Sequence, residues 1–136
     1  MVTKDGIEGF LDKLTADQGG TFNELEPGLW LVKPEGDLDF DFVVSLEDNV
    51  AVLHVKVMDM PKKKATQATL NRRLLELNAT DLIHGAYGIE QDAIVMTEAL
   101  ELSHLDYDEF RAAYESMTVA LASHLRELGA FREEAR

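Results

Sequence analysis

Residues 38–58 read LDFDFVVSLEDNVAVLHVKVM. Apolar side chains recur at every second position before and after the polar residues 47–49. The apolar residues of the first half share one face: Leu38, Phe40, Phe42, Val44 and Leu46. Those of the second half do the same: Leu53, Val55 and Val57. Residues 47–49 form the turn between the two halves. A period of two predicts an antiparallel hairpin with one buried face and one wet face.

The segment before this hairpin predicts a helix followed by extended chain. Residues 4–18 carry one apolar stripe at steps of three and four, ended by Gly19-Gly20. Residues 29–32 predict a strand, and Pro27-Gly28 marks a turn before it. Residues 21–25 could also be extended, but their pattern does not decide whether they form a strand.

The segment after the hairpin returns to helical spacing, then to strands, then to a helix. Residues 65–78 predict a helix, and the stretches around 84–90 and 93–100 predict two strands. A last helix begins after Asp106, which is suited to cap it, and we expect Gly129 to end it. The order helix, three strands, helix, two strands, helix predicts an α+β fold. We expect one antiparallel sheet packed against helices in a single domain, residues 1–136.

Composition narrows the classes of partner. Acids outnumber bases 26 to 13, so the net charge is −13. This balance excludes a nucleic-acid binder and disfavours an anionic membrane surface. It favours a basic or amphipathic polypeptide as partner, or it serves solubility alone. No cysteine, no signal-peptide pattern and no membrane-spanning apolar run are present, so we expect a cytoplasmic protein.

Reaction chemistry is not visible in the motifs. The four histidines are separated by 30, 20 and 20 residues, which is no zinc-ligand spacing. Asp37, Asp39 and Asp41 alternate along a strand, about 7 Å apart in a line rather than around a point. Neither a phosphate-binding glycine loop nor a nucleophile elbow occurs. We therefore expect no metal, no cofactor and no enzyme; the alternative is a site assembled from dispersed residues such as His54 and the acids near Asp39.

Two apolar features have two interpretations each. The stripe of residues 4–18 either covers the protein's own sheet or lifts away to engage a partner. Trp30, the single tryptophan, either anchors the sheet against a helix or, if exposed, is a binding anchor.

Residues 70–110, LNRRLLELNATDLIHGAYGIEQDAIVMTEALELSHLDYDEF, resemble a known family. The leucine-rich helix ending in LLELN, the glycine-containing strand, the strand AIVMTEALEL and the helix start LDYDEF are similar to the Tir chaperone family. They are equally similar to the YbjN-type family of sensory transduction regulators. Both have the type III secretion chaperone-like fold, and the element order of the whole chain is similar to it.

The resemblance implies a non-enzymatic homodimer that binds a partner polypeptide in a chaperone or regulatory role. It implies a dimer surface on the second helix and nearby strand, here Leu70, Leu74, Leu77 and Tyr87. It also implies a client surface on the first helix and sheet, here Phe10, Leu14 and Trp30. It implies no cofactor.

Overall fold

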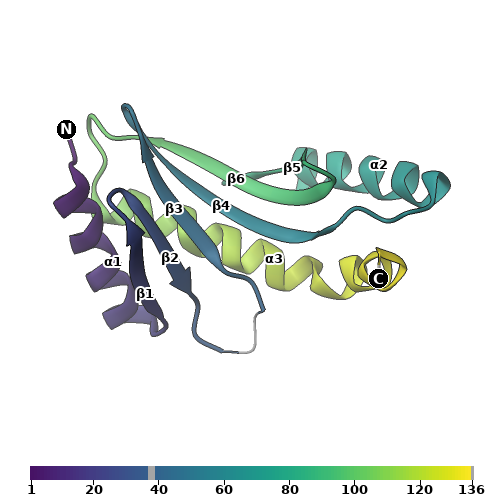
Figure 1. Ribbon diagram of the computed structural model, residues 1–136, viewed down its shortest axis with the longest axis horizontal. Helices are drawn as coiled ribbons and strands as arrows, with labels where there is room; N and C mark the ends of the chain where they lie inside the picture. The colour runs from purple at the N-terminus through teal and green to yellow at the C-terminus, as the bar shows by residue number, and fades with distance from the viewer. Residues whose placement is uncertain (37–38, 136) are drawn as a thin grey trace.

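The structure, a computed structural model, describes residues 1–36 and 39–135, and the elements alternate as the sequence predicts (Figure 1). The helices are α1 (Lys4–Gln18), α2 (Lys64–Thr80) and α3 (Tyr107–Ala135). The strands are β1 (Thr21–Glu26), β2 (Leu29–Lys33), β3 (Phe42–Glu47), β4 (Val50–Asp59), β5 (Ala86–Glu90) and β6 (Ala93–Glu101). The predicted α+β fold with one antiparallel sheet packed against helices is confirmed.

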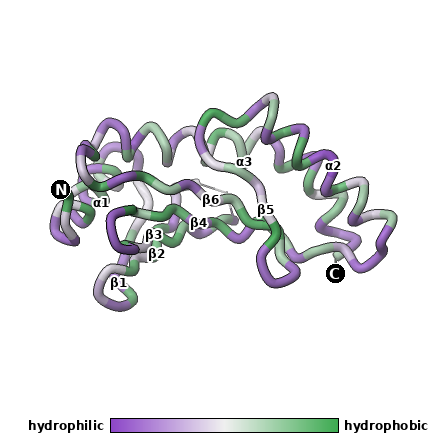
Figure 2. Tube along the Cα trace, turned by 90° about the horizontal axis from the view of Figure 1, so that it is seen from above, coloured by the Kyte–Doolittle hydropathy of each residue, from purple (hydrophilic) through white to green (hydrophobic). Residues whose placement is uncertain are grey.

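The six strands form one sheet in the order β1-β2-β3-β4-β6-β5, and every neighbouring pair is antiparallel. α3 crosses behind the middle strands, α1 lies beside the β1 end, and α2 lies beside β5 at the other end (Figure 1). Seen from above, the helices lie on the same side of the sheet (Figure 2). One face of the sheet is thus covered and the other faces away from the helices.

The structure differs from the expected order in one count, because four strands rather than three precede α2. The additional strand is β1, formed by the segment whose pattern left its conformation open. Its side chains stay largely exposed at the sheet edge, so no apolar alternation marks it. The predicted strand over 38–46 also begins later, at Phe42; Asp37 and Leu38 lie outside the described residues.

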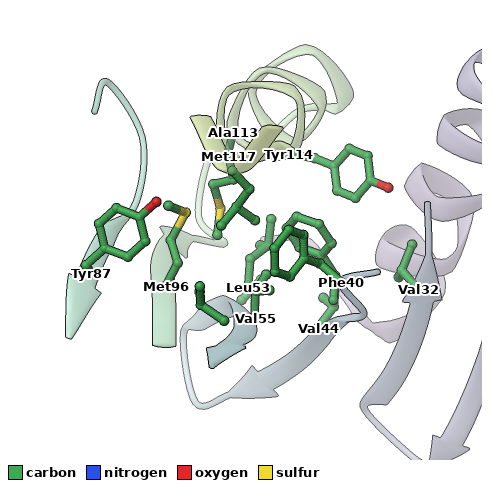
Figure 3. Close-up of a cluster of buried hydrophobic side chains, with 14 of the residues drawn as sticks. Val32, Phe40, Val44, Leu53, Val55, Tyr87, Met96, Ala113, Tyr114 and Met117 are labelled. Atoms are coloured by element: carbon green, nitrogen blue, oxygen red, sulfur yellow. The ribbon is translucent and has the colours of Figure 1, made fainter. Parts of the chain in front are cut away.

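The core lies between the covered face and α3. Ala113 and Met117 of α3 point toward the sheet, above Leu53 and Val55 of β4 (Figure 3). All four are buried, as period-two strands and a helical stripe require when their apolar faces meet. Arg132 lies 5.8 Å from the ring centroid of Phe40, which is buried although it precedes β3.

The helix ends follow the predicted chemistry in two of three cases. Gly19 and Gly20 have φ of 80° and 85°, and α1 ends there. Asp106 Oδ1 accepts a hydrogen bond of 2.8 Å from the Glu109 N–H at the start of α3. The prediction that Gly129 ends the last helix is wrong, because α3 continues to Ala135. Phe131 packs against the core beyond that glycine and extends the apolar stripe.

Candidate functional site

The uncovered face of the sheet carries two rows of side chains in register across four strands, in which apolar residues are mixed with polar ones. One row joins Leu31, Val43, His54 and Thr97 as direct cross-strand partners on β2, β3, β4 and β6. The next row joins Leu29, Ser45, Val52 and Ala99. Both rows alternate with the buried residues Phe42, Val44 and Leu53, so they point away from α3.

These rows remain partly open to solvent. Leu29, Leu31, Val43 and Val52 are half-buried by their neighbours in the sheet. No described helix crosses this face in the ribbon view (Figure 1). The apolar side chains of this face are therefore left without a covering helix among residues 1–36 and 39–135.

The three predicted client residues lie in the protein's own core. Leu14 and Trp30 are 1% and 0% exposed, and Phe10 is half-buried against Phe110. The Trp30 indole Nε1–H donates a 3.2 Å hydrogen bond to Glu8 of α1. Of the two interpretations of this stripe, the structure therefore shows α1 covering its own sheet, and a client reaches these three side chains only if α1 moves.

The four predicted dimer residues divide between the core and a groove. Leu70 and Leu77 of α2 are 0% and 1% exposed, inside the core. Leu74 of α2 and Tyr87 of β5 line a groove of about 390 Å³ between the two elements. The groove lining also contains two strongly exposed apolar side chains, Leu75 at 67% and Ile89 at 58%.

Asn78 closes part of the free edge of β5. Its side-chain amide donates a 3.1 Å hydrogen bond to the Tyr87 carbonyl, and its oxygen accepts one of 2.8 Å from the Tyr87 N–H. The side chain thus takes the place of a neighbouring strand at this residue. Asn71 lies two turns earlier on α2 and lines the same groove. Its Oδ1 is buried and has no hydrogen-bond partner among the described residues.

A hydrogen-bonded chain runs inward from this groove. The Tyr87 hydroxyl lies 2.7 Å from His124 Nδ1, and His124 Nε2 lies 3.1 Å from Asp81 Oδ2. A carboxylate only accepts, so Nε2–H donates to Asp81, and in the neutral imidazole Nδ1 accepts from Tyr87. The hydrogen bond from His124 lowers the pKa of Asp81, and burial raises the pKa of Tyr87. Tyr87 therefore stays protonated at neutral pH and can donate its hydroxyl hydrogen to His124.

His54 and Asp39, named above for a site assembled from dispersed residues, do not line the same described cavity. His54 Nε2 lies 3.5 Å from Glu90 Oε1 on the uncovered face. Asp39 lines a cavity of about 290 Å³ with Lys56 and Arg132, and His54 is not among its described lining residues. Over residues 1–36 and 39–135, no three His, Asp or Glu side chains are grouped to hold a metal ion. Within the same ranges, none of the helices has the length and apolar character to cross a bilayer.

Sequence reasoning missed Ile89, Asn78, His124 and the valines of the uncovered face. A signal existed for three of these. Ile89 stands two residues after Tyr87 and so shares its side of the strand. His124 stands three residues after Leu121 and four before Leu128, on the buried stripe of α3. Val43 stands between Phe42 and Val44, so it points to the face of the hairpin that the alternation predicts to be wet, and an apolar side chain there indicates a contact surface.

Comparisons agree with this geometry. The family model described as CesT_Tir_1 matches residues 3–134. No curated protein matches the chain significantly. A chain of the heterodimeric complex ExoU-SpcU, from the type III secretion system of Pseudomonas aeruginosa, superposes with a TM-score of 0.64 at 12% identity, covering 83% of this chain and 93% of that one.

Two further solved structures share the fold. YbjN from E. coli has a TM-score of 0.59 at 15% identity and covers 93% of this chain and 96% of its own. A chain of the HopA1-SchA chaperone-effector complex has a TM-score of 0.54 at 14% identity, with 93% of both chains covered. At these identities the likeness is one of fold.

Proposed function

Because the chain belongs to the CesT_Tir_1 family, we propose that it is a cytoplasmic, non-enzymatic chaperone-like protein. It pairs with a second copy of itself and binds a segment of a partner polypeptide. The observation that carries this proposal is the one-sided cover of the sheet. It leaves four half-buried apolar side chains, among polar neighbours, facing away from the helices: Leu29, Leu31, Val43 and Val52. Two solved structures with the same fold are described as protein complexes, one of them chaperone-effector.

The uncovered face supports binding of an extended or helical segment through its side chains. Leu29, Leu31, Val43 and Val52 present an apolar strip at the centre, and His54 places a polar group beside it. Each CH₂ of the segment that leaves water there contributes about 0.8 kcal/mol. With a net charge of −13, the protein attracts segments whose flanks carry Lys or Arg.

The groove between α2 and β5 supports pairing with a second copy. Leu75 and Ile89 are more than half exposed, and they flank the buried Leu74 and Tyr87. A two-fold contact would bring the same four side chains from both copies together and remove the exposed pair from water. In this arrangement Leu70 and Leu77 support the surface from beneath without touching the partner.

Client binding is tested by site-specific photocrosslinking. A photoreactive amino acid replaces Leu31 on the uncovered face, and a control protein carries it at Arg72, an exposed position of α2. Irradiation in the native lysate is expected to give polypeptide adducts at position 31 that are absent at position 72. Identical adducts at both positions, or none at position 31, would refute the assignment of this face.

Pairing is tested by sedimentation equilibrium. The wild type is expected to have twice the mass of the chain. The variant Leu75→Asp/Ile89→Asp is expected to have the mass of one chain, because the contact would bury two carboxylates from each copy against one another. Both side chains are exposed in the single chain, so the variant remains folded. Leu25→Asp, at a 52% exposed position of β1, is the matched control and stays paired. A folded double variant that still pairs would reject this interface.

A further inference from the structure

A second groove lies on the outer side of α3, away from the sheet. It has a volume of about 670 Å³, and its lining includes Ile83, from the loop that joins α2 and β5, and Val119 of α3. Ile83 is 86% exposed and Val119 is 65% exposed. Large apolar side chains this exposed contribute nothing to the core, so the groove is open to a partner.

The floor of this groove follows the axis of α3. Its other α3 residues include Ala112, Ser116, Ala120 and Ser123, which recur at steps of three and four. They lie on one side of the helix over a length of about 16 Å. Their side chains are short, so the backbone of a partner element can approach α3 closely.

The backbone that forms the groove floor restricts which secondary structure a bound partner segment can have. The α3 residues on the floor form their backbone hydrogen bonds within the helix, and the floor offers no strand edge. An extended segment placed on it would lose water from its N–H and C=O groups without gaining partners. A helix satisfies these groups internally, so a helix is the form that fits.

The charge of the groove restricts the sequence of that helix. Among the described residues that line it, the two charged side chains are the carboxylates of Asp81 and Glu115. Both are about half exposed, at 48% and 49% of the side chain. Glu115 contacts Gln18 and Arg111 through Oε1. Asp81 contacts His124 through Oδ2 and accepts a 3.0 Å hydrogen bond from the Thr80 hydroxyl through Oδ1. About half of each carboxylate side chain still faces water, where a cation can approach it.

We propose that the α3 groove binds an amphipathic helix of a partner polypeptide, with apolar residues on Ile83 and Val119 and Lys or Arg residues toward Asp81 and Glu115. The groove lies on the helix side of the protein, so this site is separate from the uncovered sheet face. It also uses none of the residues lining the α2–β5 groove. The inference therefore does not depend on where the client or the second copy binds.

The test uses a fluorescein-labelled synthetic helix of leucine and lysine, about four turns long, with its leucines on one face. Fluorescence anisotropy is expected to show binding to the wild type. Ile83→Ser/Val119→Ser is expected to weaken it at least about tenfold, because the buried apolar contacts are lost. Leu25→Ser, at an exposed apolar position of β1, is the matched control and leaves the affinity unchanged.

Two further measurements separate this site from its alternatives. An isomer of the peptide with scattered leucines is expected to bind the wild type no better than the original peptide binds the double variant. Backbone amide NMR shifts on adding the original peptide are expected to concentrate in residues 81–83 and 112–124. Equal binding of the two isomers, shifts centred on the uncovered sheet face, or loss of self-association in the double variant by sedimentation would each overturn the proposal.

Discussion

Substitution Tyr87→Phe tests the buried hydrogen-bonded chain from β5 to the C-terminal end of α2. The Tyr87 hydroxyl bonds His124 Nδ1 at 2.7 Å, and His124 is 5% exposed. The substitution removes one oxygen and keeps the ring, which points toward Met96 (Figure 3). Packing is thus nearly unchanged, while one nitrogen of a buried imidazole loses its partner.

The magnitude follows from that orphaned nitrogen. A buried acceptor without a hydrogen bond costs about 1–3 kcal/mol. An unfolding entropy of about 2.1 cal/mol/K per residue, over the length of this chain, converts each kcal/mol into about 3.5 °C of Tm. We therefore expect the free energy of unfolding to fall by about 1–3 kcal/mol and Tm to fall by about 3.5–10 °C.

The assay is thermal and urea unfolding at a fixed protein concentration, followed by circular dichroism. Tyr107→Phe is the matched control, because its hydroxyl donates a 2.7 Å hydrogen bond to Asp17 at the exposed surface. That variant is expected to lose less than about 0.5 kcal/mol. The double variant Tyr87→Phe/His124→Phe is expected to lose less than the sum of its single variants, since both polar partners are gone. Equal stability of Tyr87→Phe and Tyr107→Phe would refute the reasoning.

Three other outcomes follow from the structure. Gly20→Ala is expected to destabilise the protein by more than about 1 kcal/mol, because φ is +85° and a Cβ would collide with the Lys33 carbonyl oxygen. Gly129→Ala in α3 is expected to stabilise it by about 0.5–1 kcal/mol, and urea midpoints of the two variants in the opposite order would contradict this reasoning. Burial raises the pKa of Tyr114 from 10.0 to about 12, so the stability that the protonated hydroxyl contributes is complete below pH 10 and is lost as pH rises through 12. In urea unfolding, Tyr114→Phe should lose less stability than the wild type over this pH interval, and equal losses in the two proteins would contradict the prediction. Trp30 is 0% exposed, so acrylamide should quench its fluorescence weakly until urea unfolds the chain; strong quenching of the folded protein would mean that α1 does not cover it.

Much of the fold was predictable because the apolar residues of its central strands and helices recur with the regular spacing of a strand or a helix. Residues 42–57 alternate on both strands of the hairpin. The side chains that the alternation selects are buried in the structure, except Leu46, which is half-buried at the end of β3. β1 was not predictable, because an edge strand with exposed side chains has no buried face to mark it. The end of α3 was missed because Phe131 continues to pack beyond Gly129, and packing outweighs the helix cost of one glycine.

The candidate site was predictable only in part. An apolar stripe indicates that one face of an element is buried, but it does not indicate whether the same chain or a partner buries it. Phe10 and Leu14 lie on such a stripe and Trp30 lies on β2. The packing of α1 on its own chain buries Leu14 and Trp30 and half-buries Phe10. The residues that remain exposed, Leu75 and Ile89, have the same chemistry as their buried neighbours. The exposed and the buried apolar residues of this region differ only in where they lie relative to the groove between α2 and β5. That arrangement is tertiary structure, and the local spacing of apolar residues does not predict it.

The amide of Asn78 has a consequence for how large an assembly can grow. By occupying the outward N–H and C=O of Tyr87, it interrupts the ladder that a strand of another molecule would need to extend the sheet. Copies that meet at this end must therefore join through side chains, which a two-fold contact saturates. Extension of the sheet from the β5 edge into a fibre is disfavoured in this way.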